Sequence, residues 1–379
     1  MIETPVHFAV SAPSMSITPA HEVDEMLRNG AVCAVGVSGG KDSQACAIAV
    51  AKYLDAIGHT GPRVLIHSDL GRVEWKDSLP VCERLAAHLG WELISVRRGA
   101  GDMLARWEGR WAANLARYRD LSCVKVILPW STPSMRFCTS ELKAAPISSA
   151  LRKRFRDLPI VNVTGIRREE SSARSKMPVW KHDTRLTRRT AAGVTWNSII
   201  DLSIDDVFGI IRGAGLDLHE AYTQYGASRV SCAYCIMSSE ADLAAAASCE
   251  DNHALYRLMV ELEATSTFAF QGNRWLADVA PHLLPSELRG RITMAKQRAV
   301  VRQNAEARLP EHLLYTAGWP TAVPTFDEAN LIASVRREVA AALDVEVQFT
   351  TPTSVRERYE ELLTAKAGRE NSLAEPVAS

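Results

Sequence analysis

Residues 31–43 have the sequence AVCAVGVSGGKDS, and this stretch decides the fold class. Its first part, Ala31–Val37, is a short β-branched apolar run, which predicts a buried strand. Two glycines then permit a tight turn. The following stretch, Ser43–Ile57, is rich in alanine and has apolar residues three and four positions apart, which predicts a helix. A strand, a glycine turn and a helix in this order form the first half of a βαβ unit.

The same alternation continues along the chain. Further strands are expected at Arg63–His67, Trp91–Val96 and Ile160–Thr164. The intervening helices are expected at Val81–Leu89, Asp102–Arg119 and Ser140–Phe155. This order predicts an α/β fold with a doubly wound parallel sheet of the Rossmann type. Ligands of such sheets bind at the carboxyl ends of the strands, so the chemistry is expected in loops that begin near Ser38, Ser68 and Gly165.

The composition of the chain changes along its length, and this suggests four regions. Residues 1–22 are rich in Ser, Pro and Thr at their start and predict a flexible arm. Residues 23–240 contain the alternating strands and helices. Residues 241–366 predict a mostly helical C-terminal extension, and residues 367–379 a disordered tail.

The overall charge is balanced, with 44 Lys and Arg against 44 Asp and Glu among 379 residues, so no global field attracts polyanions. Residues 152–189 nevertheless contain twelve Lys and Arg against four Asp and Glu. This region could form a basic face that binds phosphates, or simply carry solvated surface charges. The sequence has no signal-peptide pattern and no long apolar run, which predicts a cytoplasmic protein without membrane contact. Its eight cysteines are then expected to be reduced thiols or metal ligands.

The turn Ser38-Gly-Gly-Lys-Asp-Ser43 has the features of a phosphate-binding loop. Gly39 and Gly40 let backbone amides approach an anion closely, and the helix N-terminus adds positive potential. Ser38 and Ser43 supply hydroxyl donors, and Lys41 supplies a charge. The loop differs from a Walker A motif, in which Ser or Thr follows the lysine. The alternative is an ordinary glycine-rich turn.

This hexapeptide resembles the signature of the PP-loop ATP pyrophosphatases, which have the adenine nucleotide alpha-hydrolase-like fold. The resemblance implies that the loop binds ATP, which is cleaved to AMP and pyrophosphate. It further implies that Asp42 helps to hold Mg²⁺, and that Asp69, in His67–Gly71, lies beside the nucleotide.

Further stretches resemble the phosphoadenosine phosphosulfate (PAPS) reductase branch of this family. They are Arg136–Lys143, Thr164–Arg174, Trp196–Val207 and Leu218–Cys235. The resemblance places four residues of the second stretch at the nucleotide phosphates, namely Gly165, Arg167, Arg168 and Arg174. Guanidinium groups at a strand end can clamp phosphate, although the same arginines could be ordinary surface charges.

Four cysteines are candidate metal ligands. Cys232 and Cys235 form a Cys-x-x-Cys pair, which can bind zinc or an iron–sulfur cluster, or act as a redox dithiol. Cys138 lies in a family motif, and Cys249 follows the pair. Adenylyl-sulfate reductases of this branch carry a cluster, so the resemblance implies a [4Fe–4S] cluster, with Zn²⁺ as the alternative. Those enzymes have a second cysteine at the position of Thr139, which leaves the fourth ligand open.

The loop, the candidate cluster and the basic region together look most like the sulfur-transfer component of bacterial DNA phosphorothioation systems. That resemblance implies adenylation of a substrate, with Lys41, Asp42 and Arg167 as catalytic residues. It implies a nucleic acid as partner, DNA rather than tRNA, a cysteine desulfurase as sulfur donor, and other subunits of a modification complex. The alternatives are an adenylyl-sulfate or PAPS reductase, a tRNA thiolase and a non-catalytic nucleotide-binding subunit. The cluster-free reductases use a cysteine near their end, and this sequence has none after Cys249.

Overall fold

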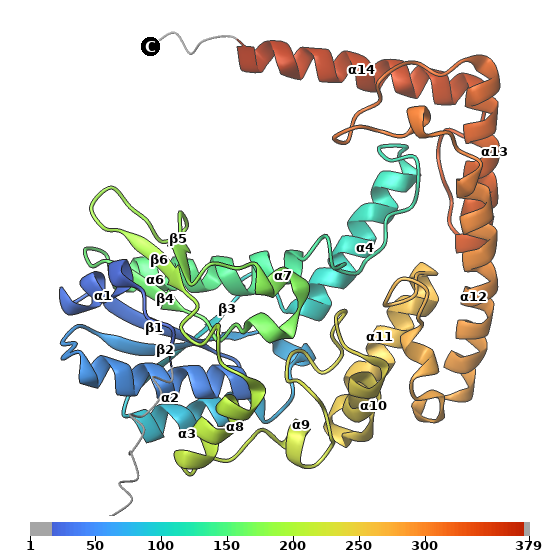
Figure 1. Ribbon diagram of the computed structural model, residues 1–379. Coiled ribbons are helices and arrows are strands. Elements are labelled where there is room, and N and C mark those ends of the chain that lie inside the picture. The colour runs from blue at the N-terminus through green and yellow to red at the C-terminus, as the bar shows by residue number, and fades with distance from the viewer. Residues whose placement is uncertain (1–16, 375–379) are drawn as a thin grey trace, which may run out of the picture. The chain divides into compact units, whose positions relative to one another are not determined.

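The computed structural model describes residues 17–374, which divide into two compact units (Figure 1). Among the described residues, the first unit contains the chain up to Ala100 and then Phe137–Ala233. The second contains Gly101–Arg136 and the described chain from Tyr234 onward. Residues 101–136 therefore pack with the second unit, although they lie inside the range 23–240 that the sequence predicts as one domain. Residues 1–16 of the predicted arm and 375–379 of the predicted tail lie outside the described residues.

The first unit is built on one six-stranded sheet with the order β3-β2-β1-β4-β6-β5. Its strands are β1 (Val32–Val37), β2 (Arg63–Asp69), β3 (Glu92–Arg97), β4 (Ile160–Val163), β5 (Trp180–His182) and β6 (Gly193–Trp196). All neighbouring pairs are parallel except β5 with β6, which is antiparallel. The predicted α/β fold with a parallel sheet is confirmed, and β5 and β6 are additions that the sequence pattern did not predict.

Helices cover both faces of this sheet, as Figure 1 shows for α2, α3 and α8 on one face and α6 on the other. Alternate residues of β1 explain the two layers, since Cys33 and Val35 belong to one buried cluster and Val32 and Ala34 to the other. The helices of this unit are α1 (His21–Arg28), α2 (Lys41–Ala56), α3 (Ser78–Leu89), α5 (Phe137–Thr139), α6 (Ala145–Arg154), α7 (Ser172–Ser175), α8 (Ile204–Gly213) and α9 (Glu220–Thr223), with a π-helical turn at Ser140–Ala144 and short 3₁₀ turns at Gly71–Val73 and Arg168–Glu170.

Residues 17–22, the described part of the predicted arm, lie against the sheet. Ile17 is buried in the core. The backbone carbonyl of Thr18 accepts a hydrogen bond from Trp196 Nε1 at 3.0 Å, and its amide donates to the Ser198 carbonyl at 2.6 Å. These contacts fix the segment before α1 to the carboxyl end of β6 and the residues that follow it.

The second unit contains helices and no strand among its described residues. Its helices are α4 (Met103–Arg119), α10 (Glu240–Ser248), α11 (His253–Ser266), α12 (Ser286–Ala307), α13 (Phe326–Leu343) and α14 (Pro352–Ala374), with 3₁₀ turns at Glu250–Asn252, Leu276–Asp278, Pro281–Leu283 and Glu311–Leu313. Arg336 of α13 is fully buried and links α13 to α4. Its guanidinium lies 5.0 Å from the ring centre of Tyr118 and donates to the Tyr118 carbonyl at 2.9 Å. α14 continues to Ala374, into the stretch 367–379 predicted as a tail.

Within residues 17–374, no helix has both the length and the apolar composition needed to cross a membrane.

Candidate functional site

The loops after β1 and β4 meet at the carboxyl edge of the sheet. At one glycine in each loop, the neighbouring backbone leaves no room for a side chain. Gly39 has a φ of 75°, and a Cβ atom there would lie 2.9 Å from the Ser78 carbonyl oxygen. A Cβ atom at Gly165 would lie 2.7 Å from the carbonyl oxygen of Asp42. Glycine is therefore required at both positions, because the β1 loop lies against the backbone of α3 at Gly39 and the β4 loop lies against the backbone of the β1 loop at Gly165.

The β1 loop leads directly into the N-terminus of α2. The Ser43 hydroxyl donates to the Gly40 carbonyl at 2.8 Å and accepts from the Ser38 amide at 3.2 Å, which closes the loop on itself. Among the described residues, no acceptor pairs with the amides of Gly39 and Gly40. Unpaired amides at the start of a sixteen-residue helix form an arrangement that can bind an anion.

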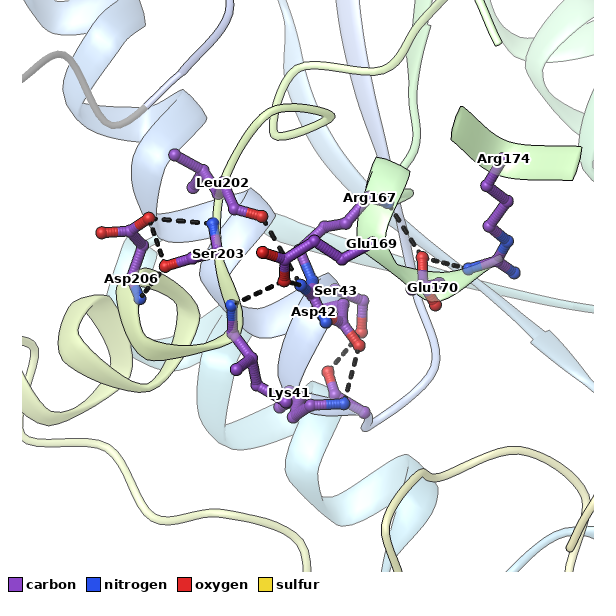
Figure 2. Close-up of polar contacts among 12 residues, drawn as sticks. Lys41, Asp42, Ser43, Arg167, Glu169, Glu170, Arg174, Leu202, Ser203 and Asp206 are labelled. Carbon is purple, nitrogen blue, oxygen red and sulfur yellow. Dashed lines mark hydrogen bonds and ion pairs between the residues drawn. The ribbon is translucent and has the colours of Figure 1, made fainter. Parts of the chain in front are cut away.

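Two cations share the Asp42 carboxylate in this loop (Figure 2). Lys41 Nζ lies 3.0 Å from one Asp42 oxygen, and Arg167 Nε lies 2.7 Å from the other. Lys41 and Arg167 are only 4% and 3% exposed. Burial disfavours the charged form of Arg167, but the hydrogen bond and charge of Asp42 outweigh it, so the pKa of the guanidinium is raised. The three residues predicted to be catalytic therefore lie together in the structure.

A second layer of acidic side chains holds the segment that carries Arg167. Arg167 Nη1 lies 2.8 Å from Glu169, whose carboxylate also accepts from the backbone amide of Ile204 at 3.2 Å. The amide of Arg167 donates to Glu170 at 2.8 Å, and Glu170 pairs in turn with Arg174. Figure 2 shows this chain of contacts running from the β1 loop to Arg174. Arg174 thus contributes to the position of Arg167 in this structure.

The remaining predicted nucleotide-binding residues have other partners. Arg168 pairs with Asp201 at 2.6 Å and donates to the backbone carbonyls of Ser175 and Met177, both at 2.9 Å. Asp69 accepts from Arg97 Nε at 2.9 Å and from the amide of Gly71 at 2.7 Å. For both residues, a role in nucleotide binding stays a prediction.

Two residues beside the β1 loop, Tyr222 and His219, are not predicted as site residues from the sequence. The Tyr222 hydroxyl accepts from the backbone amides of Lys41 at 3.3 Å and Val230 at 3.1 Å, and burial raises the pKa of Tyr222 to about 12. His219 is fully buried and lies 3.3 Å from the Ser78 hydroxyl. Both belong to Leu218–Cys235, one of the stretches that resemble the family. The sequence of this stretch alone does not indicate that it packs on the β1 loop.

We expect the free energy of unfolding to decrease as the pH falls from about 6.5 to 4. Burial disfavours the imidazolium of His219 and lowers its pKa to about 4, with Asp77 raising and Arg84 lowering it. The unfolded chain has the ordinary histidine pKa of about 6.5 and binds the proton first, so up to about 3 kcal/mol of stability is lost across this window. Urea unfolding at successive pH values should show a smaller loss for His219→Gln than for the native chain. Equal losses would contradict this assignment.

The four candidate ligand cysteines are divided between the two units. Cys138 and Cys232 belong to the first unit, and Cys235 and Cys249 to the second. Within the described part of the chain, no three His, Cys, Asp or Glu side chains form a group that could hold a metal ion. Both the [4Fe–4S] cluster and Zn²⁺ therefore stay predictions.

The other four cysteines, Cys33, Cys46, Cys82 and Cys123, are buried thiols. Burial raises the pKa of Cys46 to about 12 and that of Cys123 to about 11, and it raises the pKa of Cys33 further. Because the thiolate is the form that binds metals and attacks electrophiles, Cys33, Cys46 and Cys123 act as small core residues.

Comparisons with known proteins identify the family of this chain. Residues 32–238, more than half of the chain, match the model of the phosphoadenosine phosphosulfate reductase domain. A protein of Escherichia phage 186, described as an uncharacterized 37.8 kDa protein in the gpa 5′ region, is 26% identical over 246 residues, which are 55% of this chain and 68% of that protein.

Three solved structures are similar at low sequence identity. The PAPS reductase of Candida auris, in a phosphate complex, has a TM-score of 0.34 and 12% identity, covering 57% of this chain and 97% of that one. The NAD⁺ synthetase of Burkholderia pseudomallei has a TM-score of 0.31 and 19% identity, covering 52% of this chain and 72% of that one. The U34-tRNA thiolase NcsA of Methanococcus maripaludis, solved with its [4Fe–4S] cluster, has a TM-score of 0.31 and 10% identity. The similarity covers 69% of this chain and 87% of that one.

The family match includes the β1 loop, the segment of Arg167 and the stretch that packs on the loop through Tyr222. The chain therefore belongs to the phosphoadenosine phosphosulfate reductase domain family.

Proposed function

We propose that this chain binds ATP with Mg²⁺ on the loop Ser38–Ser43 and transfers AMP from it to an acceptor, with release of pyrophosphate. The observation that carries the proposal is the loop itself. Two unpaired glycine amides, the N-terminus of α2 and the buried ammonium of Lys41 converge there, which supports binding of a polyphosphate.

Asp42 is suited to hold Mg²⁺ because it is the carboxylate of the loop and its side chain is 19% exposed. Magnesium prefers oxygen ligands and is commonly bound by one or two carboxylates together with substrate phosphates. Arg167 Nε occupies one Asp42 oxygen, so it orients the carboxylate. Lys41 pairs with the other oxygen and would exchange that partner for a phosphate when ATP binds.

In the proposed reaction, an acceptor oxygen attacks the α-phosphorus of ATP. The bond from this phosphorus to the bridging oxygen breaks, and pyrophosphate leaves. Phosphoryl and nucleotidyl transfers depend mainly on positioning and on compensation of the negative charge in the transition state. Lys41 and the amides of Gly39 and Gly40 would supply that compensation.

We further propose that the adenylated acceptor is a backbone phosphate of DNA and that sulfur then replaces AMP. A persulfide delivered by a cysteine desulfurase would attack the activated phosphorus and expel AMP. A second thiol would then reduce the resulting sulfur–sulfur bond and leave the phosphorothioate. Other subunits of a modification complex would bring DNA and the desulfurase together. Support comes from the sequence resemblance described above.

A second candidate function is reduction of an adenylyl-sulfate or PAPS substrate. The match to the PAPS reductase domain favours it directly. The two candidates differ in their products, because a reductase forms sulfite from the sulfonucleotide and a thiol reductant. Sulfite formation without pyrophosphate release from ATP would therefore replace the first proposal with the second.

In the presence of Mg²⁺, the purified chain should convert ATP to AMP and pyrophosphate in equal amounts. Cleavage between the α and β phosphates leaves these two products, whereas ordinary ATPases leave ADP and phosphate. Chromatography of the nucleotides, together with a coupled pyrophosphate assay, measures both. The assay is repeated with DNA, with tRNA and without acceptor. ADP as the product, or no turnover under any of these conditions, would contradict the proposal.

If the chain holds a [4Fe–4S] cluster, protein purified without oxygen should contain about four irons per chain. A Cys232→Ser/Cys235→Ser variant should lose the iron, whereas Cys123→Ala should keep it because burial suppresses the Cys123 thiolate. Zinc at one equivalent in place of iron would select the alternative metal. Protein with neither metal would remove the cluster from the proposal and leave the ATP reaction to be judged separately.

A further inference from the structure

A second positively charged region of the first unit lies away from the ATP loop. A hollow of ≈ 570 Å³ is lined by five basic residues, namely Arg152, Lys153, Arg156, Arg185 and Arg188. The first three come from α6 and the turn that follows it, which lead into the amino end of β4. The other two come from the connection between β5 and β6, at the amino end of β6. The ATP loop follows the carboxyl end of β1, so the hollow lies toward the opposite edge of the sheet.

The charges of this basic hollow are not compensated by acidic side chains. No Asp or Glu lines it, and none of its five basic residues forms an ion pair within the described part of the chain. Asp157 follows Arg156 in the chain but is exposed and does not line the hollow, and two other nearby carboxylates have partners of their own. Glu92 pairs with Arg154 at 2.6 Å, and Asp183 accepts from the Thr195 hydroxyl at 2.9 Å. A chain of zero net charge therefore has a concentrated positive potential at this place.

Part of the hollow is held in place before any ligand binds. Arg188 Nη1 donates to the Arg152 carbonyl at 2.9 Å, and Nη2 donates to the carbonyls of Phe155 and Leu158. These bonds cap the C-terminal end of α6 and fix one guanidinium in the wall. Ser148 and Ser149 add hydroxyl groups to the lining. The remaining arginines, Arg152, Arg156 and Arg185, are exposed and can turn toward an anion.

We propose that the basic hollow binds the phosphate backbone of duplex DNA. Its lining has no aromatic ring and no apolar side chain larger than that of Ala145, so it offers no platform for a base. Such a surface recognises charge rather than sequence. Duplex DNA carries one negative charge about every 1.7 Å along its axis, which several closely spaced arginines can contact together. This inference rests on the DNA acceptor of the proposed function and names the surface that would hold it, and it uses none of the residues assigned to ATP.

The test measures binding of a short fluorescent DNA duplex to the full chain by anisotropy, over a series of salt concentrations. The hollow variant is Arg152→Gln/Arg156→Gln/Arg185→Gln. The matched control, Arg28→Gln/Lys52→Gln/Arg212→Gln, removes the same number of exposed charges elsewhere on the first unit. We expect the hollow variant to bind at least about tenfold more weakly at low salt. The slope of log Kd against log salt should fall by about 0.9 for each phosphate that the variant no longer neutralises.

The control should bind DNA as the native chain does, and a variant with lysine at the three hollow positions should keep most of the affinity. Pyrophosphate release without DNA should be unchanged in the hollow variant, so failure of the ATP proposal and failure of this one are distinguishable. Equal binding by the hollow variant and the control would overturn the inference. Binding of inorganic phosphate at the three arginines, without any binding of DNA by the native chain, would overturn it as well.

Discussion

Replacing Lys41 with alanine should reduce the rate of pyrophosphate release from ATP by at least about 100-fold. The Lys41 ammonium is buried at the start of α2, next to the unpaired amides of Gly39 and Gly40. A cation in this position contributes most when the negative charge of the leaving pyrophosphate develops, so kcat should fall more than the affinity for ATP. Steady-state kinetics with saturating Mg²⁺ separates the two effects.

The fold should survive this substitution. Asp42 keeps its 2.7 Å contact with Arg167, so loss of Lys41 does not leave a carboxylate without a partner. Lys52→Ala is the matched control, because Lys52 is an exposed lysine of the same helix. Its rate should equal that of the native chain. A Lys41→Ala variant that releases pyrophosphate at a rate within a few fold of native would exclude Lys41 from the reaction.

The parts of the fold that depend on local pattern could be predicted from the sequence. The strands β1, β2, β3 and β4 are apolar runs bounded by polar or glycine residues, and the sequence pattern predicts each within two residues of its bounds. The loop Ser38–Ser43 could be predicted for the same reason, since its glycines and its following helix are contiguous. The meeting of Asp42 with Arg167, which are 125 positions apart, follows from the rule that parallel strands share a carboxyl edge.

Other features depend on tertiary contacts that local pattern does not reveal. The helical pattern of α4 is the same whichever unit it packs against, and its contacts there are with residues far away in sequence, such as Arg336 of α13 and Phe268. The strand β5 has three residues, two of them exposed and polar, and forms by pairing with β6. Likewise, the family resemblance predicts Arg168 at the nucleotide phosphates, but the sequence could not show that Arg168 donates to the carbonyls of Ser175 and Met177.

Arg167 and Asp42 should behave as one unit in catalysis. Asp42→Asn removes the carboxylate proposed to hold Mg²⁺ and leaves Lys41 and Arg167 without the anion between them. Arg167→Lys keeps the charge but removes the fork that reaches Asp42 through Nε and Glu169 through Nη1. Each variant should lower kcat by about 100-fold and raise the Mg²⁺ concentration needed for half-maximal rate.

The double variant decides how Arg167 acts. If Arg167 works by orienting Asp42, its loss adds little once Asp42 is gone, and Asp42→Asn/Arg167→Lys should be no slower than the slower single variant. If Arg167 instead contacts the phosphates of ATP directly, the two losses should multiply, and Arg167→Lys alone should raise the KM for ATP without changing the Mg²⁺ dependence. Rates measured across a grid of ATP and Mg²⁺ concentrations for the four proteins distinguish these results. We expect the first, because in this structure the Arg167 guanidinium is buried and already bonded to two carboxylates.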